Sequence, residues 1–478
     1  MSNKKVENKD SGNVVLSIKE KCGYACTDFA GNLLQVTVGT YIMYFYTDVF
    51  GIPASGALGA SVILLVARFA DALGAILWGS IVDHTHTKWG QARPWFLWLT
   101  APFVVTVWLT FFCPDIPDGL PKFLYALLTY VLSMGLIYTG VETALTAILP
   151  NLTSNPEERV KANSFRLSGG ILGGFITCSF CIPLVNFFGV AFTGEKNDRV
   201  GFMVTLALFG IITAAVLLFA FTTLRERNYH PETQKPIPFK DSLRACKGNW
   251  PWIILFVAFT IFWIAQSTRN GTSTYYAKYV LGNENLTSLI NGCQILGIAS
   301  TFCMPFLVKH TNKTATMLIG LGVAAAGQLL IPFSANFIGT EIFGLPGELI
   351  AFTCFWAIGV LGASVALGMP FAMLADTVDY GEWKNGVHAA GFLTAVGSAF
   401  CIQAGSGFGA YVPLEIMNAA GYVANQIQTP DALNAISFCF IYLPVIVYAV
   451  VAVIMLFYRK YEKMEPMIKA ELAKRHSK

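Results

Sequence analysis

The chain contains a long succession of apolar stretches, each about as long as a bilayer is thick. A transmembrane helix needs about 20 predominantly apolar residues. Of the 478 residues, 55% are hydrophobic and 13% are charged, whereas about 25% are charged in soluble domains. We therefore predict an all-α, polytopic membrane protein with twelve transmembrane helices. The predicted spans are 22–50, 55–82, 95–113, 121–150, 165–190, 201–224, 251–281, 285–308, 314–334, 346–375, 389–418 and 432–458.

The longest polar interval between spans falls near the middle of the chain, at 225–250, and carries six Lys and Arg residues. Six spans, a basic linker and six spans are typical of a transporter built from two pseudo-symmetric bundles. The predicted domains are an N-terminal tail 1–21, a bundle 22–224, a central cytoplasmic loop 225–250, a bundle 251–458 and a C-terminal tail 459–478.

The distribution of basic residues predicts the orientation. If both termini are cytoplasmic, the inner segments hold 26 of the 32 Lys and Arg residues and the outer segments hold four. Because cytoplasmic loops are enriched in Lys and Arg, we expect a multi-pass plasma or inner membrane protein with both termini inside. The polar first 20 residues show no signal-peptide pattern. Three tyrosines fit an outer aromatic belt, namely Tyr275, Tyr276 and Tyr279.

Arg68 and Asp71 lie inside the second apolar span. Each charge within a bilayer costs about 2.5–3.5 kcal/mol on insertion scales, so such residues usually mark the path of an ion or solute. The two are three residues apart on one helical face and can pair. A polar loop follows at once and contains Asp83 and Arg93. This segment predicts a membrane transporter rather than an enzyme.

Two further carboxylates lie within predicted spans. Asp28 is near the start of the first span, and Asn32 is one turn further on the same face; Asp28 either binds a polyhydroxylated solute or caps the helix at the interface. Glu142 lies in the fourth span, with Thr139 three residues earlier on the same face. Because burial raises the pKa of a carboxyl group, Glu142 is a candidate proton site as well as an acceptor for sugar hydroxyls.

Three basic residues have two interpretations each. Arg166 lies at the start of the fifth span and is either a site residue or an ordinary interfacial anchor. Arg269, deep in the seventh, either reaches the outer interface or needs an acidic partner or anionic ligand, such as a uronate carboxylate. Lys384 lies in a predicted loop after the tenth span and is either solvated or reaches Asp28 or Asp71.

Glycines recur at helical spacing in the fifth span, at Gly169, Gly170, Gly173 and Gly174. Small residues let helices approach closely, so this span should pack tightly on a neighbour. No Walker A loop and no hydrolase or metalloprotease motif is present, and all six His fall in predicted loops or the tail. Coupling to protons would therefore use carboxylates.

Several motifs together resemble the glycoside–pentoside–hexuronide:cation symporter family, which belongs to the major facilitator superfamily and includes melibiose, xyloside and glucuronide carriers. The resemblance covers nearly the whole chain. The motifs are Asp28-Phe29-Ala30, Tyr46-Thr47-Asp48-Val49, Arg68-x-x-Asp71-Ala72, Gly79-x-x-x-Asp83, Trp89-Gly90-x-x-Arg93-Pro94-Trp95 and the stretch from Asp376 to Lys384. The stretch from Gly421 to Pro430 looks like that of glucuronide carriers.

The resemblance implies a twelve-helix major facilitator fold and roles for individual residues. It implies sugar-site roles for Asp28, Glu142 and Arg166, an interfacial lysine at Lys384, and a cation-site acid at Asp71 supported by Thr139. Two positions depart from the family pattern. The second cation-site Asp of sodium-using members is Ala75 here, preceded by Gly74, and an expected aromatic platform is Thr146. Loss of two oxygen ligands favours H⁺ over Na⁺ as the coupling ion.

We therefore expect uptake of a glycoside, neutral or uronate, by proton symport with alternating access between the bundles. Sodium coupling and uncoupled facilitation are the alternatives within this class. The alternative outside it, an enzyme acting on lipid-linked sugar, would use Asp376, Asp379 and Glu382. We expect no cofactor, bound metal or nucleic-acid partner. The predicted solute-binding residues are Asp28, Asn32, Glu142, Thr146, Arg166 and Arg269. Those for coupling are Asp71, Thr139 and Glu142, and those for gating are Arg68, Asp83, Arg93 and Lys384.

Overall fold

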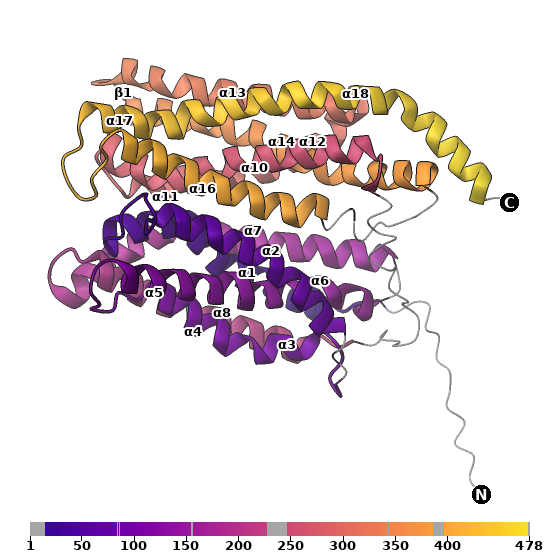
Figure 1. The fold of residues 1–478 in the computed structure, drawn as a ribbon, viewed down its shortest axis with the longest axis horizontal. Coiled ribbons are helices and arrows are strands. Elements are labelled where there is room, and N and C mark those ends of the chain that lie inside the picture. The colour runs from indigo at the N-terminus through magenta and orange to yellow at the C-terminus, as the bar shows by residue number, and fades with distance from the viewer. Residues whose placement is uncertain are drawn as a thin grey trace, which may run out of the picture. The chain divides into compact units, whose positions relative to one another are not determined.

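The computed structural model describes residues 15–83, 85, 87–153, 156–226, 246–342, 344–385, 393 and 396–476, and Figure 1 shows these elements as a ribbon. In the first half the helices are α1 (Ile18–Tyr44), η1 (Phe45–Val49), α2 (Ala60–Asp83), α3 (Arg93–Trp98), α4 (Thr100–Thr110), α5 (Leu120–Tyr130), η2 (Val131–Tyr138), α6 (Thr139–Leu152), α7 (Pro156–Thr193) and α8 (Asp198–Thr223).

The second half contains helices and one pair of two-residue strands. The elements are α10 (Trp250–Tyr275), η3 (Tyr276–Val280), α11 (Leu286–Gly292), η4 (Cys293–Leu296), α12 (Gly297–His310), α13 (Lys313–Leu330), η5 (Ile331–Phe337), β1 (Glu341–Ile342), β2 (Leu345–Pro346), α14 (Gly347–Asn385), η6 (Val396–Phe400), α16 (Cys401–Ala419), α17 (Pro430–Ser437), η7 (Phe438–Tyr442) and α18 (Leu443–His476).

The prediction of an all-α polytopic fold is confirmed. Each of the twelve predicted spans contains described helix, and seven helices in the described part of the chain are long and apolar enough to cross a membrane. The elements η1, η2, η3, η6 and η7 are π-helical. Such wider turns are frequent at functional sites, and the apolar pattern of the sequence does not reveal them.

A segment predicted as a loop is helical, and so is most of the predicted C-terminal tail. Residues 376–385 continue α14, and residues 459–476 continue α18. The two extensions stabilise each other. Lys313 at the start of α13 pairs with Asp376 and lies 3.6 Å from Glu465, and the indole of Trp383 donates to Glu471 at 2.5 Å. The loop prediction was wrong because Asp376 and Trp383 find partners on neighbouring helices.

The contacts divide the chain into two compact units. Unit 1 contains residues 1–38, 70–117 and 124–234, and unit 2 contains residues 39–69, 118–123 and 235–478. The units do not follow chain order, since the end of α1, η1 and the start of α2 group with the second half. The predicted bundle limits stay a prediction.

In unit 1, α7 packs closely on α1. A Cβ at Gly169 would overlap the carbonyl of Ala25, and one at Gly173 would lie 2.5 Å from the carbonyl oxygen of Phe29. One turn further, the hydroxyl of Thr177 donates to the carbonyl of Leu33 at 2.7 Å. The close packing predicted from the glycine pattern is confirmed at Gly169 and Gly173.

In unit 2, α10, α13, α14 and α18 surround an apolar core that includes Phe262, Leu321 and Met373. The hydroxyl of Tyr448 in α18 donates to Gln266 of α10 at 2.9 Å within this core. The predicted outer aromatic belt is wrong for Tyr275 and Tyr276, whose exposed fractions are 0% and 6%. The ring of Tyr275 packs against Tyr44 and Tyr422, and the ring of Tyr276 packs against Phe352 and Phe440.

Candidate solute-binding and coupling site

Asp28 is the centre of a polar cluster on α1. It is buried, and the side-chain amide of Asn32 donates to its carboxylate at 3.1 Å and to its backbone carbonyl at 2.9 Å. A Cβ at Gly170 of α7 would lie 2.7 Å from the second carboxylate oxygen of Asp28. Gly170 of α7 therefore leaves room for this carboxylate. The hydrogen bond from Asn32 orients the side chain of Asp28.

The structure brings Arg166 and Glu142 close to Asp28, so that the charges of all three groups interact. They come from α1, α6 and α7. The guanidinium Nε of Arg166 donates to Asn163 Oδ1 at 3.0 Å, which orients it from its own helix. Two carboxylates and one guanidinium in one place can accept hydrogen bonds from, and donate them to, adjacent hydroxyl groups of a solute.

Tyr138 lies among these carboxylates and was missed by the sequence analysis. Its hydroxyl is 3.5 Å from Glu142 Oε2, and it interacts electrostatically with Asp28 and Asp71 as well. Its ring centroid is 5.8 Å from that of Phe103, and a Cβ at Gly31 would touch it at 3.6 Å. Tyr138 is therefore an aromatic residue one turn before Glu142, whereas the position one turn after it is Thr146. In the sequence, the one indication of this contact is that Tyr138 lies four residues before Glu142, an acid within a predicted span.

Asp71 contacts the π-helical segment η2. It is 3% exposed, and a Cβ at Gly135 would lie 3.1 Å from its Oδ1. Just after η2, the hydroxyl of Thr139 donates to the carbonyl of Met134, five residues earlier, at 3.0 Å. Thr139 lies beside α2, because a Cβ at Gly74 would be 3.8 Å from its Cβ. Asp71 is therefore placed in the same unit as Asp28 and Glu142.

A family model described as MFS/sugar transport protein matches residues 23–460. The chain belongs to this family. The transporter is 38% identical to the isoprimeverose transporter of Lactiplantibacillus pentosus, covering 96% of this chain and 92% of that protein. It is 31% identical to the glucuronide carrier protein homolog of Escherichia coli K12, covering 89% and 88%. Its family and these relatives are transporters, not enzymes.

The transporter also shares its fold with solved major facilitator structures. It aligns with a bacterial homolog of the human lysosomal transporter Spinster at a TM-score of 0.66 and 15% identity, covering 95% of this chain and 99% of that one. It aligns with the nucleoside transporter NupG at a TM-score of 0.64 and 13% identity, covering 92% and 99%. At these identities the likeness concerns the fold alone. It agrees with the major facilitator fold that the sequence motifs implied.

Other predicted site residues of the transporter lie further from the carboxylates or belong to unit 2. Thr146 is exposed, and its hydroxyl donates to the carbonyls of Glu142 and Thr143 in its own helix. Arg269 belongs to unit 2, is 2% exposed and lies 5.0 Å over the ring of Trp356. The role of Arg269 as a solute-binding residue stays a prediction.

The four predicted gating residues have different surroundings. Arg68 donates to Gln403 of α16 at 2.9 Å. Lys384 donates to the carbonyl of Gly248 at 2.8 Å. Arg93 donates through Nε to the carbonyl of Phe221 at 2.8 Å. Asp83 ends α2, and its side chain lies outside the described residues.

Among the described residues of the transporter, no group of three His, Cys, Asp or Glu side chains could hold a metal ion. Asp376, which the enzyme alternative would use, pairs with Lys313.

Proposed function

We propose that this transporter imports a neutral glycoside by proton symport, alternating the access of one solute site between the two sides of the membrane. The family description supports sugar transport. The isoprimeverose transporter, at 38% identity over nearly the full length, supports a glycoside as the solute. The arrangement of charged residues in unit 1 supports the finer parts of the proposal.

The observation that carries the proposal is the meeting of Asp28, Glu142 and Arg166 from three helices of unit 1. Carboxylates accept hydrogen bonds from sugar hydroxyls, and a guanidinium donates to ring and hydroxyl oxygens. Hydrogen bonds to charged groups contribute about 1.5–3 kcal/mol each. Three such groups, with Tyr138 as an aromatic surface beside them, suit a pyranose ring.

The charge balance favours a neutral solute over a uronate. Asp28, Glu142 and Asp71 interact with Tyr138 in one place, and Arg166 is the cation that interacts with Asp28 and Glu142. A uronate carboxylate would add repulsion against like charges in a medium of low dielectric constant.

Asp71 is the favoured proton carrier. Its carboxylate lies against the backbone of η2, where Gly135 leaves room for it. Burial favours the neutral form of a carboxyl group and neighbouring charges shift the balance, so a change in solute occupancy near Tyr138 can change proton binding at Asp71. Ala75 in place of a second acid removes an oxygen ligand that a sodium ion would need.

We also propose the plasma or inner membrane as the location, with both termini in the cytoplasm, on the strength of the Lys and Arg distribution. In this orientation η1, η3 and the turn between α16 and α17 lie toward the outside.

Uptake of labelled solutes into vesicles holding the purified transporter tests the solute class. A panel of neutral glycosides and uronate glycosides would be compared, with Asp28→Asn as the site variant and Asp431→Asn, an exposed acid at the start of α17, as the matched control. We expect uptake of neutral glycosides that is lost in Asp28→Asn and kept in Asp431→Asn. Uptake restricted to uronates would contradict the charge argument, and uptake that survives Asp28→Asn would contradict the site.

A further inference from the structure

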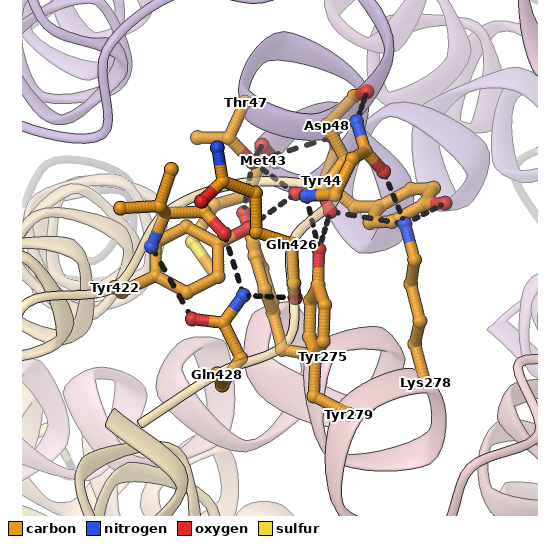
Figure 2. Close-up of polar contacts among 12 residues, drawn as sticks. Met43, Tyr44, Thr47, Asp48, Tyr275, Lys278, Tyr279, Tyr422, Gln426 and Gln428 are labelled. Atoms are coloured by element: carbon orange, nitrogen blue, oxygen red, sulfur yellow. Dashed lines mark hydrogen bonds and ion pairs between the residues drawn. The ribbon is translucent and has the colours of Figure 1, made fainter. Parts of the chain in front are cut away.

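Asp48 in η1 lies at the centre of a second polar cluster, which belongs wholly to unit 2 (Figure 2). Its carboxylate is fully buried. It accepts hydrogen bonds from Thr47 at 2.7 Å, from Lys278 at 3.1 Å, and from the hydroxyl of Tyr279. Lys278 and Tyr279 come from η3, about 230 residues further along the chain, and both point toward Asp48.

A third stretch reaches the same carboxylate from the turn between α16 and α17. The hydroxyl of Tyr422 donates to Asp48 Oδ2 at 2.6 Å, and Lys278 donates to Asn425 Oδ1 at 2.7 Å. Burial raises the pKa of Tyr422, so its hydroxyl keeps its proton and remains a donor. We call the set Asp48, Lys278, Tyr279, Tyr422 and Asn425 the carboxylate latch.

Asn425 of the carboxylate latch has a left-handed backbone conformation. Its φ is 58°, the one positive value among the described non-glycine residues. Its backbone N–H donates to the hydroxyl of Tyr279 at 2.9 Å, and its side-chain amide donates to the backbone carbonyl of Asp48. Gln428 braces the turn by donating to the carbonyls of Val423 at 2.5 Å and Gln426 at 2.8 Å. Left-handed backbone persists where contacts over-determine it, and it clusters at switching regions.

The latch differs in kind from the helix packing in unit 1. There, α1 and α7 meet through glycine and backbone, which have one close-packed arrangement. Here the three stretches meet through side-chain hydroxyl, amide and ammonium groups, whose hydrogen bonds water can replace. Such a contact is stable when closed, yet it can open as a whole.

Both helical segments that supply the latch are π-helical, η1 on one side and η3 on the other. Two sequence motifs also meet here that the solute site does not use: the one around Asp48 and the one that starts at Gly421. Neither has a role in the solute and proton site of unit 1.

We propose that the carboxylate latch is a gate: its closure holds η1, η3 and the turn after α16 together, and it must break in each cycle before this end of the transporter opens. It is one of several links between residues 39–69 and the second half, since Ser61 and Arg68 also donate hydrogen bonds to Glu415 and Gln403. The inference rests on membership of the transporter family and not on which solute is carried.

Hydrogen exchange of the full-length transporter, read by mass spectrometry without any solute, tests the gate. Asp48→Asn keeps the shape of the side chain but removes its charge. We expect amide exchange to rise about tenfold together in residues 44–50, 276–283 and 420–428, which corresponds to a loss of about 1.4 kcal/mol and lies near the value of one hydrogen bond to a charged group. Amides of α13 should exchange as in the wild type. Tyr422→Phe, which removes one donor, should give the same pattern at smaller size.

Asp118→Asn is the matched control. Asp118 also pairs with a lysine, Lys122, at 2.7 Å, but it is 87% exposed and its partner is four residues away. Its loss should leave all three stretches unchanged. A rise in only one of the three stretches in Asp48→Asn, or no rise in any, would overturn the gate. So would a uniform rise over the whole chain with a lower Tm, since it would mean a structural role. None of these outcomes depends on the solute or the coupling ion.

Discussion

Gly170 of α7 lies directly against the carboxylate of Asp28 on α1: a Cβ at this glycine would be 2.7 Å from Asp28 Oδ2 and 3.0 Å from Asn32 Nδ2. The shape of the proposed solute site therefore depends on a missing side chain as much as on the charged ones. A helix that packs on its neighbour through glycine leaves room for a carboxylate between two backbones.

Gly170→Ala should disturb the site more than the fold. Overpacking by one methyl group costs about 1–3 kcal/mol, and here the strain falls on the rotamer of Asp28, so we expect solute binding to weaken about tenfold or more. Gly174→Ala is the control, because its Cβ would meet Val36 at an ordinary 3.6 Å. Binding of a neutral glycoside to the purified protein measures both. Equal effects of the two variants would show that Asp28 is not involved.

Arg166→Gln removes the cation that interacts with the carboxylates of Asp28 and Glu142. Loss of one hydrogen bond to a charged group, at about 1.5–3 kcal/mol, predicts solute binding weaker by about 10- to 100-fold. The measurement is solute binding by calorimetry, with Lys460→Gln as the control because Lys460 is an exposed cation of α18. A similar loss in both variants would point to a general effect of charge.

Glu158 ties the start of α7 to the start of α1. Its carboxylate accepts from Lys21 at 2.7 Å, from Lys161 at 3.0 Å and from the backbone N–H of Leu16 at 3.2 Å. These hydrogen bonds lower the pKa of Glu158 to about 2. Because the folded pKa lies below the ordinary value of 4.5, this stabilisation is present above pH 4.5 and is lost as the pH falls toward 2.

Glu158→Gln tests this pH dependence. Above pH 5 the variant should have a lower Tm than the wild type, and the two Tm values should converge as the pH falls toward 2. Asp118→Asn is again the control, since the pair of Asp118 with Lys122 is exposed and exposed pairs contribute little. A difference in Tm between Glu158→Gln and wild type that does not change with pH would contradict the assignment.

Lys313→Met should destabilise unit 2. Lys313 is 26% exposed and pairs with Asp376, whose side chain is 7% exposed. Removing one partner of a buried pair costs about 3–5 kcal/mol, and partial exposure of Lys313 reduces this to about 1–3 kcal/mol. Thermal unfolding of the purified protein gives the comparison, with Lys309→Met as an exposed control near the end of α12. An unchanged Tm would mean that water solvates Asp376 as well as Lys313 does.

The membrane spans and part of the site were predictable because they depend on local sequence. Length and hydropathy predicted the spans, and the cost of burying charge singled out Asp28, Asp71 and Glu142. The glycine spacing of α7 predicted close packing, which the structure confirms at Gly169 and Gly173. Each of these signals can be read from one helix without its neighbours.

The parts that the sequence did not reveal depend on contacts between distant segments. Asp48 and Tyr422 are 374 residues apart, so neither segment alone indicates a buried carboxylate cluster. Tyr275 looked like a residue of an interfacial belt because composition does not distinguish a lipid-facing ring from one packed inside. Residues 376–385 looked like a loop because the partners of Asp376 and Trp383 lie in α13 and α18, far away in the sequence.

We propose proton-driven accumulation of a neutral glycoside, with Asp71 as the proton carrier. The most direct measurement is uptake of a labelled neutral glycoside into vesicles, with an inward proton gradient, an inward sodium gradient or neither, for wild type and Asp71→Asn. We expect accumulation above equilibrium with the proton gradient alone, and equilibration without accumulation in Asp71→Asn. Accumulation driven by sodium alone, or proton-driven accumulation that persists in Asp71→Asn, would contradict it.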